Sequence, residues 1–146
     1  MGVVFVSAKI VKIQLITTRR KDTIAAVLDY ARYTMSPFVY DNEELENLCE
    51  EVRHWSEEYT YTPIQIRLKQ RLTTLDLRHF VWNIGERLGT KNGYNGYAHA
   101  DFIRAMFPDV IKDIEQDSIC NFKFQPNKGS IVIDEPDEDD YHFHIK

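Results

Sequence analysis

The chain has 146 residues, of which 43% are hydrophobic and 12% aromatic, and its formal net charge at pH 7 is −5. A chain of this length buries most of the surface that its unfolded form exposes, and this composition is that of a folded protein rather than a disordered tail. Its apolar runs fall short of the ~20 residues that a membrane span needs, so we expect one domain over residues 1–146 and no membrane partner.

The two cysteines, Cys49 and Cys120, match no spacing of metal ligands or of a redox pair. We therefore expect two buried thiols in a reducing compartment. The N-terminal stretch resembles a signal peptide superficially, but Lys9 and Lys12 interrupt its apolar residues and no small-residue cleavage site follows. These features predict a cytoplasmic protein.

Residues 3–16 are rich in Val and Ile, and residues 11–15 alternate between apolar and polar side chains. This period of two predicts one long strand or a hairpin that pairs with a C-terminal sheet. A first helix is expected over residues 23–35, with Asp22 as its N-cap and with Ser36 and Pro37 at its end.

The second predicted helix begins at Asp41, which has the spacing of a capping box with Glu44. Apolar residues then follow at steps of three and four: Leu45, Leu48, Val52, Trp55 and Tyr59. The opposite face is strongly acidic, because residues 41–58 contain a single basic residue, Arg53. We predict that this face binds a partner through Glu43, Glu46, Glu50 and Glu57.

Residues 62–89 form the stretch around which the rest of the chain is expected to pack. Thr62 and Gln65 have the spacing of another capping box, and Gly89 has the position of a helix-ending glycine. The apolar pattern slips in phase beside Thr74, so the sequence fits either one bent helix or two helices with Thr74 as the second cap. Its basic face consists of Arg67, Lys69, Arg71 and Arg78.

A loop is expected over residues 89–97, since its glycines and asparagines tolerate positive φ. It follows a helix and fits neither phosphate-loop spacing, so we predict no phosphate site. Tyr94 and Tyr97 have two interpretations of equal weight. They are exposed anchors for a partner, or they pack down over the helices.

A further apolar helix is predicted over residues 99–107, restarting at Pro108 and continuing to about residue 115. The period changes to two after Ile119, and a turn at residues 126–129 separates two alternating runs. Together with the N-terminal strand, this pattern predicts an α+β fold: a body of four to five helices packed with a small antiparallel sheet.

The last predicted strand contains His142 and His144, after an acidic run over residues 134–140. Two imidazoles at i and i+2 on a strand project from one face and can bind one zinc or other transition ion. A third ligand would come from the acidic run, from His99 or from His79. In the other interpretation both C-terminal histidines face water, and no cofactor is predicted.

The charge pattern gives little support to nucleic-acid binding. The helix expected over residues 99–115 carries four acids against Arg104 and Lys112, and such a surface repels phosphate. The remaining basic surface for nucleic acid is the face of residues 62–89, with Arg67, Lys69, Arg71 and Arg78.

No catalytic motif is visible, since neither cysteine has an indicated histidine partner and no G-x-S-x-G elbow occurs. We expect a non-catalytic protein-binding or regulatory module with a basic partner, because complementary charge selects partners. One specific form is an acidic inhibitor that occupies the nucleic-acid site of a basic enzyme. The alternatives are a metal-dependent enzyme using His142 and His144, and a nucleic-acid-binding protein. A homo-oligomer is compatible with all three.

Overall fold

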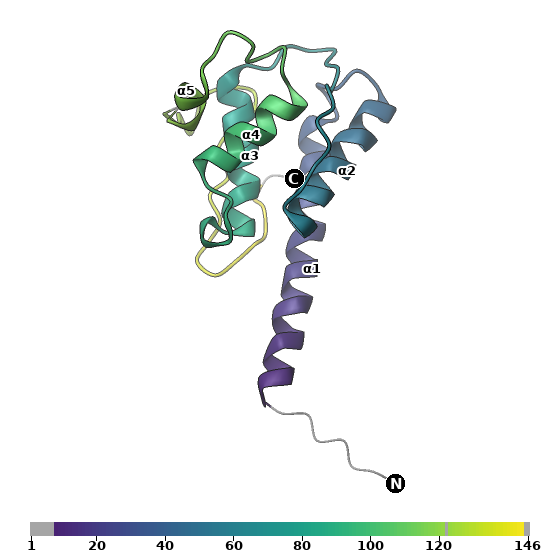
Figure 1. The fold of residues 1–146 in the computed structure, drawn as a ribbon, viewed down its shortest axis with the longest axis vertical. Coiled ribbons are helices and arrows are strands. Elements are labelled where there is room, and N and C mark those ends of the chain that lie inside the picture. The colour runs from purple at the N-terminus through teal and green to yellow at the C-terminus, as the bar shows by residue number, and fades with distance from the viewer. Residues whose placement is uncertain (1–7, 122, 145–146) are drawn as a thin grey trace.

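The computed structural model describes residues 8–121 and 123–144, and these ranges form a helical protein (Figure 1). Within these two ranges the chain forms five α-helices and one short 3-10 helix. Strand pairing within the described ranges is limited to an isolated antiparallel bridge between Val39 and Leu68. The predicted α+β class is therefore wrong, because neither the N-terminal strand nor the C-terminal sheet forms there.

Helix α1 spans Ala8–Met35 and includes most of the predicted N-terminal strand. Residues 3–7 of that prediction lie outside the described residues. An alternation of only five residues does not separate a strand from a helix, and the helix satisfies its backbone groups without a sheet partner. The helix continues through Asp22, the predicted cap, and ends at Met35 as predicted. Over residues 17–35, where its side chains are described, the buried apolar residues are Ile24, Val27, Tyr30, Ala31 and Met35.

Helix α2 spans Asn42–Glu58 and matches its prediction closely. The Asp41 carboxylate accepts a hydrogen bond from the Glu44 N–H at 2.9 Å, which confirms the N-cap. The reciprocal half of the capping box is missing, because the Glu44 carboxylate instead accepts from the Arg67 N–H at 2.6 Å. The buried face consists of Leu45, Leu48, Val52 and Trp55.

Helix α3 spans Thr74–Leu88, which is only the second half of the predicted central helix. Thr73 is its N-cap and forms a full capping box with Asp76, so the cap lies one residue before the predicted Thr74. Gly89 ends the helix with φ 102°, as predicted. The helix lies in the core through fully buried side chains: Leu77, Phe80, Val81 and Ile84.

The first half of the predicted central helix, residues 62–73, has no regular secondary structure. The Thr62 N–H donates to the Glu51 carboxylate at 2.5 Å, so the predicted box with Gln65 does not form. Further along, the Ile66 N–H donates to the Met106 carbonyl at 2.8 Å. Hydrogen bonds to other elements thus replace the helical ones that local propensity favours.

The remaining helices are short. The 3-10 helix η1 spans Thr90–Asn92, α4 spans Gly96–Met106 and α5 spans Gln116–Cys120. The predicted continuation of α4 over residues 108–115 is wrong, because this stretch consists of turns and bends. Pro108 has no N–H to donate, so the hydrogen-bond pattern of α4 does not extend through it. Both cysteines are free, and Cys49 is buried whereas Cys120 is half-buried.

The last described stretch, residues 125–144, is neither helical nor paired in a sheet. We call it the C-terminal strap. It runs alongside α3 and is drawn in yellow in Figure 1. It also contacts α1, where the Phe143 ring stacks on Tyr30 with centroids 4.2 Å apart. Among the helices of the described ranges, none has both the length and the apolar character needed to cross a bilayer.

Candidate functional site

One face of α3 is polar although it is buried. Its members follow one another at steps of three and four, so they share a helix face. These residues are Asp76, His79, Asn83 and Arg87, with exposed fractions of 2%, 0%, 0% and 9%. Their side chains bind the main chain of the strap, which explains why the predicted strands need no sheet partner.

The first contacts fix the beginning of the strap. The Asp76 carboxylate accepts from the N–H groups of Ser130 and Ile131 at 2.7 and 3.1 Å. The ring of His79 contacts the Ile131 carbonyl through Nδ1 at 2.8 Å and the Gln125 N–H through Nε2 at 3.3 Å. Since a carbonyl only accepts and an N–H only donates, these partners select the neutral ring with its proton on Nδ1.

Asn83 binds the middle of the strap from both ends of its amide. Its oxygen accepts from the Asp134 N–H at 2.8 Å, and its nitrogen donates to the Val132 carbonyl at 2.9 Å. The same nitrogen donates to the Tyr30 hydroxyl at 2.7 Å. Burial raises the pKa of Tyr30 to about 12, so this hydroxyl is neutral.

A buried ion pair joins Arg87 to Asp134 at 3.0 Å, with side-chain exposures of 0% and 1%. Arg87 also donates to the His142 carbonyl at 3.1 Å, and its guanidinium lies 4.0 Å from the centroid of the Phe143 ring. Burial lowers the pKa of Arg87, and the hydrogen bond with Asp134 opposes that shift. A buried pair of this kind contributes more to the position of the strap than to net stability.

The two C-terminal histidines bind separate carboxylates. His144 lies 2.6 Å from Asp134 through Nδ1 and 3.0 Å from Asp137 through Nε2. The hydrogen bond with Asp137 is the largest cause that raises the pKa of His144, and the hydrogen bond with Asp134 is the second. His142 contacts Asp140 at 2.5 Å. The described residues contain no group of three or more His, Cys, Asp or Glu side chains arranged to bind a metal.

The two candidate third ligands are both buried and lie in other places. His79 lies under the strap, as described above. His99 is 4% exposed, and a Cβ at Gly85 would overlap its Nε2. Burial lowers the pKa of His99 to about 4, and the positive charge of Arg78 adds to this shift. A hydrogen bond with the Tyr94 backbone opposes it.

The four basic residues predicted as a nucleic-acid surface do not share a helix face. Arg78 is 2% exposed, donates to the Cys120 carbonyl at 3.3 Å and lies 5.2 Å from the centroid of Phe124. The other three belong to the irregular residues 62–73 and are exposed: Arg67, Lys69 and Arg71. The helical face on which that hypothesis depended is therefore absent.

The predicted acidic surface of α2 is partly neutralised within the chain, by Arg32 and Arg53. All four acids are exposed: Glu43, Glu46, Glu50 and Glu57. Glu46 pairs with Arg32 of α1. Arg53 pairs with both Glu50 and Glu57, in the latter case at 2.9 Å. The negative charge available to a partner on this face is therefore smaller than the sequence suggests.

The two loop tyrosines differ in exposure, and the interpretation in which they pack down over the helices holds for Tyr94. Tyr94 is 2% exposed and its hydroxyl donates to the Trp55 carbonyl at 2.6 Å. Tyr97 is 62% exposed at the start of α4. Tyr97 therefore keeps the geometry of a surface anchor, whereas Tyr94 belongs to the core.

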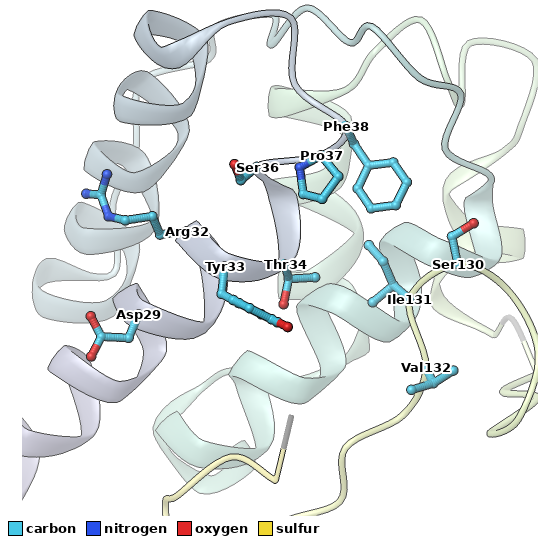
Figure 2. Close-up of a pocket in the computed structure, with 10 residues that line it drawn as sticks. All are labelled: Asp29, Arg32, Tyr33, Thr34, Ser36, Pro37, Phe38, Ser130, Ile131 and Val132. Carbon is cyan, nitrogen blue, oxygen red and sulfur yellow. The ribbon is translucent and has the colours of Figure 1, made fainter. Parts of the chain in front are cut away.

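A groove of about 820 Å³ opens between the end of α1, the turn that follows it and the strap (Figure 2). We call it the strap groove. Figure 2 shows Tyr33 and Phe38 directed toward strap residues on the other side. Its lining residues are Asp29, Arg32, Tyr33, Thr34, Ser36, Pro37, Phe38, Ser130, Ile131 and Val132.

The sequence did not predict the strap groove, because residues 130–132 were assigned to a sheet. Tyr33 was the one feature of the sequence that could have indicated the groove. Tyr33 is a large aromatic residue of α1 that lies off the apolar face of that helix, and it is 60% exposed. Val132 is 37% exposed on the other side of the groove.

No protein-family model matches the chain, and no curated protein or solved structure is significantly similar to it.

Proposed function

We propose that the chain is a non-catalytic protein-binding module whose strap groove takes a basic segment of a partner with an apolar anchor. The observation that carries the proposal is the apolar lining left open to water, with the exposed Tyr33 on the helical side of the groove and the exposed Val132 on the strap side. A concave apolar site of this size, with a few polar groups at its rim, is typical of a binding site.

The charge around the groove supports a basic partner. Arg32 lines the groove but is paired with Glu46, so its charge is compensated within the chain. Asp29 lines the same side, is exposed and has no salt bridge among the described residues. The strap continues into the acidic residues 134–140, and the whole chain carries −5. Complementary charge increases association rates and selects partners.

The lining also supports an anchor of medium size. Phe38 and Ile131 lie deeper than the exposed Tyr33 and Val132, so the groove offers an apolar base between two exposed side chains. Burying one large apolar side chain there contributes about 1.5–3 kcal/mol. Affinity beyond that depends on the basic flanks and on rim hydrogen bonds.

Several finer expectations stay predictions. The inhibitor of a basic, nucleic-acid-handling enzyme is one form of this proposal. A cytoplasmic location and the binding role of the α2 acids are equally open to test. Of those four acids, Glu43 alone has no salt bridge among the described residues.

The proposal is tested with a phage-displayed library of random 12-residue peptides, selected against the full chain. We expect enrichment of peptides with Lys or Arg around one large apolar residue. The variant Tyr33→Ala should weaken a selected peptide at least tenfold, about 1.4 kcal/mol, because it removes one side of the groove. The matched control is Tyr97→Ala, which removes a tyrosine of equal exposure outside the groove and should change affinity less than twofold.

Two results would contradict the proposal. Selected peptides that bind Tyr33→Ala as tightly as the unaltered chain place the binding site elsewhere. Acidic or uncharged selected peptides, or affinity that does not fall when salt rises from 50 to 500 mM, remove the argument for a basic partner.

A further inference from the structure

One side of the strap groove belongs to the strap and the other side to the helical body. Ser130, Ile131 and Val132 line the groove, and all three are bound through their main chain to α3. The groove therefore exists only while the strap lies on α3, which we call the closed state.

Asp134 joins the middle of the strap both to α3 and to His144, the last described residue of the strap. Its N–H donates to Asn83 directly after the groove-lining residues, and its carboxylate pairs with Arg87. The same carboxylate accepts from the His144 N–H at 2.8 Å, ten residues later. Residues 134–144 of the strap thus form a loop that closes on Asp134.

The polar side of α3 makes an open state accessible. Opening the strap exposes Asp76, His79, Asn83 and Arg87, which water can solvate, whereas an apolar face would lose its burial. The large fully buried side chains of the body belong mainly to the helices rather than to the strap: Met35, Leu48, Trp55, Leu77, Phe80, Ile84, Phe102, Ile103 and Met106. Local opening below the free energy of global unfolding fits this division.

We propose that partner binding in the strap groove is coupled to closure of the strap, with Asp134 as the residue that controls the equilibrium. The inference rests on the proposed function, since it concerns the same groove. A partner that binds only the closed state has an apparent Kd equal to its intrinsic Kd divided by the closed fraction. By reciprocity, the partner raises the closed fraction by the same factor.

Removing the Asp134 charge shifts the equilibrium toward the open state. In the closed state of Asp134→Asn, the buried Arg87 keeps its charge without a carboxylate partner, which is strongly unfavourable. In the open state that guanidinium is hydrated. The matched control is Asp137→Asn, because Asp137 also contacts His144 but its side chain is 72% exposed and does not touch Arg87.

The test uses the full chain and one basic peptide from the library selection. We expect Asp134→Asn to weaken the peptide at least tenfold and Asp137→Asn to change affinity less than twofold. In the unaltered chain, saturating peptide should slow hydrogen exchange at the amides of Ser130, Ile131 and Asp134 at least tenfold. Amides in the middle of α4, which do not touch the strap groove, serve as the internal reference.

The outcomes separate this inference from the proposed function. Peptide binding that is lost in Tyr33→Ala but unchanged in Asp134→Asn, with strap exchange unaffected by peptide, overturns the coupling and leaves the proposed function intact. A peptide that binds equally to Tyr33→Ala overturns both. If Asp134→Asn loses its helical circular dichroism, the exchange measurement on the unaltered chain decides: slower strap exchange supports the coupling, and unchanged exchange overturns it.

Discussion

His99 is a weak base because it is buried beneath α3, next to Gly85 and with its ring centroid 6.3 Å from that of Trp55. Its pKa in the folded chain is lowered to about 4, against 6.5 when unfolded. Between these values the unfolded chain binds more protons, so the free energy of unfolding falls as the pH falls through this window. We expect a loss of about 3 kcal/mol between pH 7.5 and 4 from this residue.

Urea denaturation across that pH range measures the effect. His99→Gln cannot titrate there, so its stability should depend less steeply on pH than that of the unaltered chain. Equal slopes for the two chains would show that His99 is accessible to protons in the folded state.

His144 predicts the opposite dependence. Hydrogen bonds with Asp137 and Asp134 raise its pKa, while the third charged group of this cluster, Arg87, is paired with Asp134. Its stabilisation of the strap is therefore complete below pH 6.5 and is lost as the pH rises through the raised pKa. Protection factors of strap amides should fall from pH 6 to pH 8. The fall should be absent in His144→Gln, and a fall of equal size there would assign it to another group.

At the scale of the element, the start of α3 offers a paired test of the cap. Thr73 accepts from the Asp76 N–H, while Thr74 is the first helical residue. We expect Thr73→Ala to lower the free energy of unfolding by about 1 kcal/mol, because it leaves an N–H of the first turn without its partner. Thr74→Ala should change it by less than about 0.5 kcal/mol. Denaturant titration of both variants checks this. A larger loss of stability in Thr74→Ala than in Thr73→Ala would show that Thr74 is the cap, as the sequence predicts.

Local signals predicted the ends of several elements correctly. The cap at Asp41, the end of α1 before Ser36 and the end of α3 at Gly89 all follow from the chemistry of one or two residues. Elements that depend on distant partners could not be predicted in this way. The alternating pattern of the strap was interpreted as a sheet, although side chains of α3 replace the missing strand.

Buried acidic residues account for much of the difference between the predicted elements and the observed fold. Glu44 and Glu51 are both 8% exposed, and each binds a main-chain N–H of residues 62–73. Asp76 does the same for the strap. In the sequence these residues count toward an acidic surface and toward helical pairs. In the fold they hold irregular segments in place, as backbone partners do in a sheet.

At the scale of the whole molecule, helices α1 to α4 form the body and the strap completes one side of it (Figure 1). The candidate site lies where the two meet, so its existence depends on the contacts between α3 and the strap. None of the residues that line it was predicted to bind a partner. The acidic character of the chain, in contrast, was visible from composition and still bears on the choice of a basic partner.

The most direct test of the strap groove as the binding site is chemical-shift mapping of a library-selected basic peptide on the isotope-labelled full chain. Binding in the groove predicts the largest amide shifts at Tyr33, Phe38 and Val132. Shifts centred instead on Glu43 or Tyr97, with those three amides unmoved, would contradict it and would return the binding site to the surface that the sequence predicted.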